Sequence, residues 1–153
     1  MNLTKVLKNA FLIMLASLVL SACATKKVQN QLQGDVYTGS DTVEYLASGV
    51  ADRVFFATNE SVLTTASRET LRKQAEWLRK NSKVNVVLEG HADERGTREY
   101  NLALGERRAN AAKDYLMTYG ISGNRISVIS YGKERPVDSG SNPLAWSKNR
   151  RSV

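Results

Sequence analysis

The chain has 153 residues, which is enough for one small domain together with a targeting segment. Hydrophobic residues make up 42% of it and charged residues 24%, proportions that are ordinary for a soluble globular domain. The net charge of +7 suits a polyanion, a membrane surface or a wall polymer without choosing among them. The single cysteine excludes both an internal disulfide and a cysteine-based metal site.

The first 22 residues have the pattern of a secretory signal. A short basic region, MNLTKVLK, precedes the hydrophobic run NAFLIMLASLVL. About a dozen apolar residues are too few for a comfortable membrane span, which needs roughly 20, but they are the usual length for a signal peptide. We therefore predict a signal peptide over residues 1–22.

The sequence LSAC at residues 20–23 resembles the lipobox of bacterial lipoproteins, whose cysteine is lipid-modified and becomes the first residue of the mature chain. An ordinary signal peptide with an incidental cysteine is the alternative. Several acyl chains on Cys23, at about 0.8 kcal/mol per buried methylene, would hold the protein on a membrane. Because Ala24 follows the cysteine instead of an aspartate, the resemblance implies the outer membrane, with the protein facing the periplasm.

Residues 23–49 are polar and read as the lipidated cysteine followed by a flexible tether, with a short helix around residues 43–47 as an alternative for part of it. The folded domain is predicted over residues 50–153. Its first element is a strand over residues 53–59, RVFFATN, because the run is short, apolar and aromatic. A helix follows over residues 64–81, with Thr64 or Thr65 near its N-cap.

The rest of the domain continues this alternation. The dense apolar run KVNVVLEG predicts a strand over residues 83–90. A long helix is predicted over residues 98–120, ended by Gly120, and its apolar stripe consists of Gly105, Ala109, Ala112, Leu116 and Tyr119. A third strand covers residues 125–132, a helical turn follows Pro143, and a fourth strand begins at residue 151. This order predicts an α/β (α+β) sandwich with its helices on one face of a small mixed sheet.

The charged stretch at residues 90–110, GHADERGTREYNLALGERRAN, is the candidate site. Asp93 comes just after a predicted strand, and ligands of α/β sheets usually bind outside the carboxyl ends of strands. Arg108 lies about 60° from the centre of the apolar stripe of its helix, so its guanidinium can reach the side of the sheet. The two residues therefore form either a ligand site or a structural salt bridge with each other.

Other chemistries have weaker support. His91 is the only histidine, so a hydrogen-bonded packing role is favoured over a metal site. The sequence has no G-x-S-x-G elbow and no phosphate-binding loop, and the adjacent acids Asp93 and Glu94 should diverge. We predict no catalytic residue, no metal and no cofactor. Nucleic acid is not expected as a partner, because basic residues are mixed with acids in a secreted chain.

Three segments, EGHADERGTREYNLALGERRANAAKDYL, ISVISYGKERPV and SKNRRSV, resemble the OmpA-like peptidoglycan-binding domain family from residue 53 to the C-terminus. The resemblance implies a βαβαβ domain that binds, non-covalently and without turnover, the diaminopimelate residue of the peptidoglycan stem. Asp93 and Arg108 match the family positions for this ligand. A carboxylate and a guanidinium at one site complement a zwitterion that carries an ammonium and a carboxylate.

The same resemblance assigns further positions and partners. Leu104 and Phe56 match ligand-contacting positions, the backbone of Ala57 could bond the ligand, and Arg95 could assist with another carboxylate. With the lipobox and tether, the resemblance implies that the protein links the outer membrane to peptidoglycan, in envelope integrity and cell division. It also implies the periplasmic protein TolB and other Tol-system proteins as partners.

The sequence departs from the family in two places. The first strand usually reads F-D-F-D or F-N-F-N, whereas here it reads FFATN, so Ala57 offers no polar side chain. The last strand of the family normally continues for several residues past NRR, whereas this sequence stops at Val153. We therefore expect a shortened last strand. The two departures also motivate an alternative function, an interaction module of the same fold that has lost wall binding.

Overall fold

The computed structural model describes residues 32–33, 36–37, 45–46 and 49–153. The predicted signal peptide, the lipobox with Cys23 and most of the predicted tether lie outside these residues. The chain divides into two units, Met1–Leu32 and Gln33–Val153, and the folded domain belongs to the second. Within the described ranges, no helix combines the length and the apolar content needed to cross a membrane. The domain boundary at residue 50 stays a prediction.

Four two-residue strands precede the main sheet, namely β1 (Leu32–Gln33), β2 (Val36–Tyr37), β3 (Tyr45–Leu46) and β4 (Val50–Ala51). Strands β3 and β4 pair antiparallel, with Tyr45 opposite Ala51. The short helix considered around residues 43–47 is therefore wrong at Tyr45–Leu46, and its other residues lie outside the described ranges. Gly49 has φ of 77°, a left-handed conformation that favours glycine and suits the reversal before β4.

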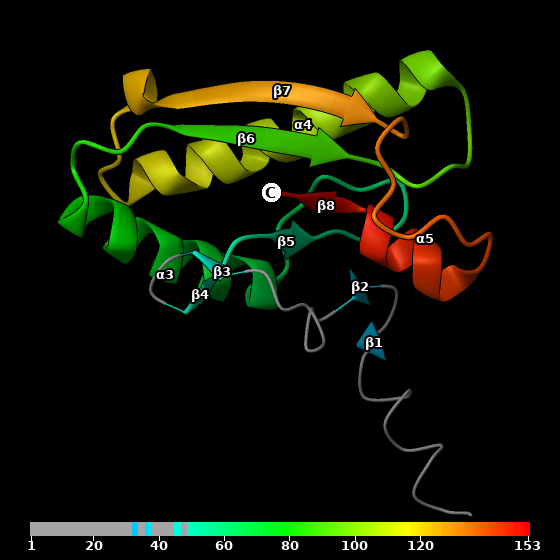
Figure 1. Cartoon of the computed structure of the whole chain (residues 1–153), viewed down its shortest axis with the longest axis horizontal. Coiled ribbons are helices and arrows are strands. Elements are labelled where there is room, and N and C mark those ends of the chain that lie inside the picture. The colour runs from blue at the N-terminus through cyan, green and yellow to red at the C-terminus, as the bar shows by residue number, and fades with distance from the viewer. Residues whose placement is uncertain (1–31, 34–35, 38–44, 47–48) are drawn as a thin grey trace, which may run out of the picture. The chain divides into compact units, whose positions relative to one another are not determined.

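The main sheet has four strands in the order β5-β8-β6-β7 (Figure 1). Strands β6 (Val86–His91) and β7 (Ile126–Gly132) are parallel, whereas β8 (Arg151–Ser152) pairs antiparallel with both β5 (Val54–Phe55) and β6. The predicted mixed sheet is thus confirmed. Strand β8 occupies the interior of the sheet, between β5 and β6.

Among the described residues, three α-helices are present, α3 (Thr65–Lys80), α4 (Arg98–Thr118) and α5 (Pro143–Asn149), and a 3₁₀ turn, η1 (Gly123–Arg125), precedes β7. Each helix begins after a side-chain cap: the side-chain oxygens of Thr64, Thr97 and Asn142 accept hydrogen bonds from the backbone N–H groups of Ser67, Tyr100 and Ala145. Helix α4 ends just before Gly120, whose φ is 83°, as the sequence predicts.

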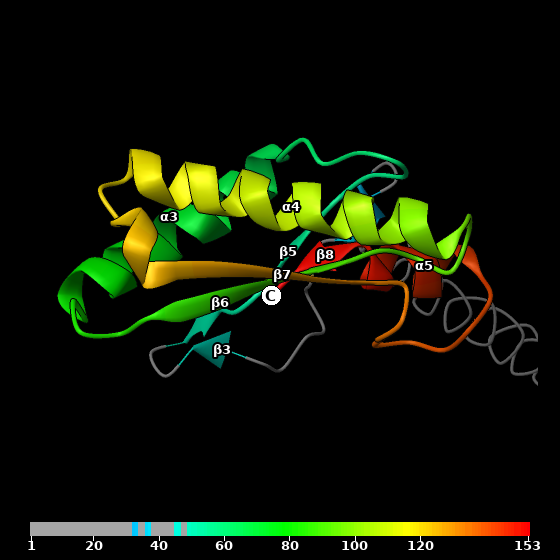
Figure 2. The same cartoon turned by 90° about the horizontal axis from the view of Figure 1, so that it is seen from above.

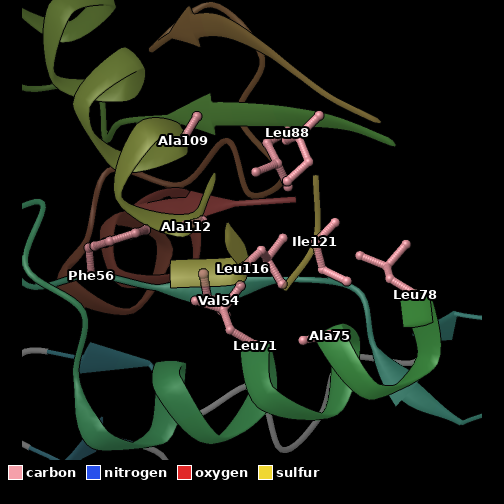
Figure 3. Close-up of a cluster of buried hydrophobic side chains, with 11 residues drawn as sticks. Val54, Phe56, Leu71, Ala75, Leu78, Leu88, Ala109, Ala112, Leu116 and Ile121 are labelled. Atoms are coloured by element: carbon pink, nitrogen blue, oxygen red, sulfur yellow. The ribbon is translucent and has the colours of Figure 1, made fainter. Parts of the chain in front are cut away.

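Helices α3 and α4 lie on the same face of the sheet (Figure 2), which confirms the predicted layering. The core between them is apolar (Figure 3), and it consists of Val54, Phe56, Leu71, Ala75, Leu78, Leu88, Ala109, Ala112, Leu116, Ile121 and Ile126. Helix α4 lies so close to β6 that a Cβ atom on Gly90 would overlap the backbone carbonyl of Gly105, so only glycine fits at Gly90. This contact places the first turns of α4 beside the carboxyl end of β6.

The first strand is shorter than predicted, since β5 covers only Val54–Phe55 of the expected residues 53–59. Phe56 still donates its N–H to the carbonyl of Arg150 at 3.0 Å, but the chain then turns. Glu60 donates its N–H to the carbonyl of Ala57 at 3.3 Å, and Asn59 has φ of 57°. The turn points backbone carbonyls of this segment toward the site.

Candidate ligand-binding site

Asp93 is the centre of a charged cluster at the carboxyl end of β6, two residues after the strand ends. Its side chain is only 9% exposed. Arg95 donates to it from Nε at 3.0 Å, from Nη2 at 2.8 Å and from its backbone N–H at 3.1 Å. Arg150 Nη1 lies 3.4 Å from the same carboxylate. Burial raises the pKa of Asp93, but the hydrogen bonds from Arg95 and Arg150 outweigh it and leave the pKa below its ordinary value. The carboxylate is therefore charged at neutral pH.

Arg108 projects from α4 into the same end of the sheet and is fully buried. Its guanidinium donates to three backbone carbonyls: Nε to Glu60 at 2.9 Å, Nη1 to His91 at 2.8 Å and Nη2 to Ala57 at 3.0 Å. Burial and the nearby Arg150 lower the pKa of Arg108 to about 10, so the group stays charged at neutral pH. Arg108 thus ties α4 to β6 and to the turn after β5.

Asp93 and Arg108 do not pair with each other in the part of the chain that the structure describes. The ion pairs of Asp93 are with Arg95 and Arg150, and the hydrogen bonds of Arg108 go to backbone carbonyls. The salt-bridge alternative for these two residues is therefore wrong. The physical reason is that three carbonyls converge on Arg108 where β6 and the β5 turn end.

Arg95 is the accessible cation of the cluster, with 42% of its side chain exposed. Its guanidinium lies 4.3 Å from the ring centre of Trp146 on α5, and its Nη2 reaches the hydroxyl of Thr58 at 3.3 Å. Trp146 in turn donates its indole N–H to Glu94 at 2.8 Å. The side chain of Arg95 therefore connects the loop after β6, where Asp93 lies, with the segment after β5, where Thr58 lies.

The remaining predicted site residues lie nearby but are mostly covered. Phe56 is fully buried, 5.2 Å beneath the Arg108 guanidinium, and Leu104 is 3% exposed on α4. The backbone carbonyl of Ala57 is engaged by Arg108. Phe56 and the Ala57 carbonyl thus lie against Arg108, and Phe56 and Leu104 are both buried packing residues.

Arg150 is the residue that sequence reasoning missed. It is 1% exposed, and besides its contact with Asp93 it donates from Nε to the carbonyl of Phe56 at 3.0 Å. The adjacent arginines of NRR, beside a predicted last strand, were the only signal in the sequence. The sequence alone does not show which of these two arginines reaches the site, because the side chains of consecutive residues enter different environments.

His91 packs in the sheet, but the expected hydrogen bond is wrong. Its ring stacks on Tyr131 with 5.6 Å between the ring centres, and among the described residues neither ring nitrogen has a hydrogen-bond partner. Its nearest carboxylate oxygen, of Glu89, is 3.5 Å away. Burial, followed by the charges of Arg151, Arg135 and Arg53, lowers the pKa of His91 to about 3. The ring is therefore neutral at physiological pH.

Known proteins resemble this chain in sequence and in fold. The model of the OmpA family matches residues 55–150. A peptidoglycan-associated lipoprotein of Mesorhizobium japonicum is 43% identical over 145 residues, covering 92% of this chain and 86% of that protein. One from Rhizobium meliloti is 46% identical over 142 residues, covering 90% and 81%. The crystal structure of the peptidoglycan-associated lipoprotein from Burkholderia pseudomallei has a TM-score of 0.64 at 34% identity, over 65% of this chain and 85% of that one.

Proposed function

The chain belongs to the OmpA family, and from this membership we propose that its domain binds peptidoglycan non-covalently through the diaminopimelate residue of the peptide stem. The observation that carries the proposal is the charged cluster at the carboxyl end of β6. It holds one carboxylate, Asp93, beside the guanidinium groups of Arg95, Arg108 and Arg150. A zwitterionic group needs such a pairing of opposite charges at one place.

Asp93 would accept the ligand's ammonium. Two of its neighbours, Arg95 and Arg150, already hold its carboxylate in the charged form. A bound ammonium would compete with Arg95 for these oxygens. Arg95 is the more exposed of the two arginines, so it would turn away and offer its guanidinium to another carboxylate of the stem. This exchange gives Arg95 a role in binding that its position in the free protein does not display.

Arg108 would bind the ligand's carboxylate. A guanidinium has five N–H hydrogens, and within the described residues three hydrogen bonds connect this one to backbone carbonyls, which leaves two for a ligand. Because the bonds to Ala57, Glu60 and His91 fix its plane, the remaining donors are held in place before the ligand arrives. Phe56 and Leu104 would support this arrangement from below.

The relatives named above support the cellular role. They are peptidoglycan-associated lipoproteins, and the LSAC sequence at residues 20–23 of this chain resembles the lipidation site of bacterial lipoproteins. We infer that lipid on Cys23 anchors the protein in the outer membrane, facing the periplasm, and that the domain links this membrane to the wall without catalysing a reaction. Participation in the Tol–Pal system, with TolB as a partner, is part of the same proposal.

Calorimetric titration of the full chain, purified in detergent, with a muropeptide that carries free diaminopimelate tests the proposal. We expect saturable binding. The matched ligand control is the same muropeptide with the side-chain carboxyl of diaminopimelate amidated, which keeps the ammonium and removes the charge that Arg108 would bind. Its affinity should fall at least tenfold, and this comparison requires no change in the protein.

Two protein variants locate the site. Asp93→Asn should abolish binding, whereas Arg107→Ala, an exposed neighbour of Arg108, should leave it unchanged. Circular dichroism establishes that each variant is folded. A folded parent that binds neither muropeptide would overturn the clamp and favour the protein-interaction module. Release of soluble fragments from isolated sacculi would overturn the non-enzymatic assignment.

A further inference from the structure

Two arginines hold the Asp93 carboxylate, and they differ in how easily they can leave it. Arg150 is 1% exposed and also donates from Nε to the carbonyl of Phe56 at 3.0 Å, so it is fixed in the interior. Arg95 has 42% of its side chain exposed, and it donates to Asp93 from Nε at 3.0 Å and from Nη2 at 2.8 Å. A cation of the chain itself therefore occupies the oxygens that a ligand's ammonium would need. Of the two arginines, Arg95 is the one that can release them.

Trp146 is placed to keep Arg95 in this position. The guanidinium carbon of Arg95 lies 4.3 Å from the centre of the indole ring, within the range of a cation–π contact. The indole N–H donates to one carboxylate oxygen of Glu94 at 2.8 Å, and the hydroxyl of Ser141 donates to the other at 3.1 Å. These bonds restrain the ring. The indole thus contacts one face of the guanidinium while the N–H groups at its edge bond Asp93.

The side chains of this region form a closed set of contacts around one short loop. Asp93, Glu94 and Arg95 are consecutive, and Trp146 on α5 contacts the last two of them. Because Glu94 restrains the indole and the indole contacts Arg95, each contact supports the next. Arg150 follows at the end of α5, where its backbone N–H donates to the carbonyl of Trp146 at 3.1 Å. The same helix end therefore positions the fixed arginine and supports the removable one.

We propose that Arg95, supported by Trp146, is an autoinhibitory latch, which occupies the Asp93 carboxylate in the free protein and must open before the ligand binds. The proposal rests on the function proposed above, in which Asp93 accepts the ammonium of diaminopimelate. The ligand then has to displace an internal cation, and its apparent affinity is reduced by the fraction of molecules that are closed. The contact between Arg95 and Trp146 sets this fraction. Trp146 is therefore a positioning residue that acts through Arg95 and limits the affinity.

The latch also favours a zwitterion over a simple amine. An ammonium group alone would only replace one cation by another on Asp93, so little binding energy remains to open the latch. A zwitterion also bonds Arg108, and these charge-assisted hydrogen bonds offset the loss of the Arg95 contact. The latch thus keeps Asp93 from capturing amines that lack the carboxylate.

Calorimetric titration of the full chain in detergent with the diaminopimelate muropeptide tests the latch. Trp146→Leu removes the ring and leaves Asp93, Arg95 and Arg108 in place, so it should bind about three- to tenfold more tightly than the parent. Trp146→Phe keeps an aromatic face and should fall between the two. A purely structural role of Trp146 predicts the opposite sign, because loss of a supporting residue weakens a site. Unchanged or weaker binding by a folded Trp146→Leu variant would overturn the proposal.

A second measurement needs no ligand. The pKa of the Asp93 carboxyl, followed by ¹³C NMR of the full chain in detergent, should be higher in Trp146→Leu than in the parent. Burial is retained in this variant, but the Arg95 hydrogen bonds that lower the pKa form less often. Arg150 keeps its contact with Asp93 in both proteins, so the difference reports on Arg95. An unchanged pKa would overturn the latch even if neither protein binds the muropeptide. A raised pKa without muropeptide binding would support the latch and overturn the proposed ligand.

The fluorescence of Trp146 reports the opening itself. The chain has two tryptophans, so Trp77→Phe leaves Trp146 as the only one. Saturation of this variant with the muropeptide should change its emission, because Arg95 leaves the ring. Adding Arg95→Gln should abolish the change, since no guanidinium is then present to move. A change of equal size in both proteins would overturn the latch, because the ligand itself would then be acting on the ring.

Discussion

The two halves of strand β6 differ in how they are completed. At its carboxyl end, Gly90 and His91 are enclosed by β8, α4 and the arginines around Asp93. At its start, Val86 and Leu88 line a cavity of about 270 Å³. The same strand thus supports a polar region in which backbone carbonyls have charged donors, and an apolar region that lines a cavity under α3 and α4.

The two halves of β6 differ in what burial requires of their groups. Buried carbonyls need hydrogen-bond donors, and one guanidinium supplies three at the polar end. Apolar side chains need only contact with other apolar groups, and α3 and α4 supply this contact over the other half. Removal of one residue should therefore cost most at the polar end, where one side chain satisfies many groups.

Arg108→Ala tests the polar half and should have the largest effect. The substitution leaves the carbonyls of Ala57, Glu60 and His91 without a donor, at about 1–3 kcal/mol for each that water cannot reach. We expect the free energy of unfolding in urea to fall by roughly 3–5 kcal/mol. Arg107→Ala, one residue earlier and exposed, is the matched control and should change it by less than about 0.5 kcal/mol. Equal effects of the two substitutions would contradict the role of Arg108.

A pair of leucine substitutions compares the interior of the core with its edge at the cavity. Leu71 is 1% exposed, and Leu88, which lines the cavity, is 7% exposed. Leu71→Ala should lower the free energy of unfolding by about 4 kcal/mol, and Leu88→Ala by about 2 kcal/mol, because the cavity side of Leu88 has fewer packing partners to lose. Urea titration followed by circular dichroism measures both. A larger loss for Leu88→Ala would contradict the looser packing at the cavity.

The pH dependence of stability tests the neutral ring of His91. Its pKa is about 3 in the folded chain and near 6.5 when unfolded, so between these values only the unfolded state binds the proton. Stability contributed by the neutral ring is complete above pH 6.5 and should fall by up to about 1.4 kcal/mol per pH unit as pH decreases toward 4. His91→Phe keeps the stacking on Tyr131 and removes the titration. Parallel pH profiles for both proteins would refute the assignment.

Local chemistry explains which elements could be predicted. Thr64 and Asn142 cap helices within three residues of themselves, and Gly120 ends α4 by its own conformation, so the sequence nearby contains the whole signal. The extent of β5 could not be predicted in this way. Residues 57–59 follow directly on the apolar run that predicts the strand, but the carbonyl of Ala57 accepts a hydrogen bond from Arg108, about 50 positions later, instead of from a neighbouring strand.

The charged cluster shows the same limit more sharply. Asp93 and Arg108 could be identified as site residues from their motif, yet Asp93 pairs with Arg150, which sequence reasoning missed. Arg150 also bonds Phe56, which lies 94 positions away. No local pattern predicts a partner at such a separation, because the order of strands in the sheet decides which chain segments meet.

The sequence by itself determined the layering of helices on a mixed sheet, the positions of the helix ends, and the placement of Asp93 just beyond a buried strand. Periodicity and capping set these features, and both act within a few residues. The tertiary structure alone decided that β8 lies inside the sheet, that the charges are shared among Asp93, Arg95 and Arg150, and that a cavity lies beside Val86 and Leu88. Pairing between distant strands brings these groups together, and only the folded chain specifies that pairing.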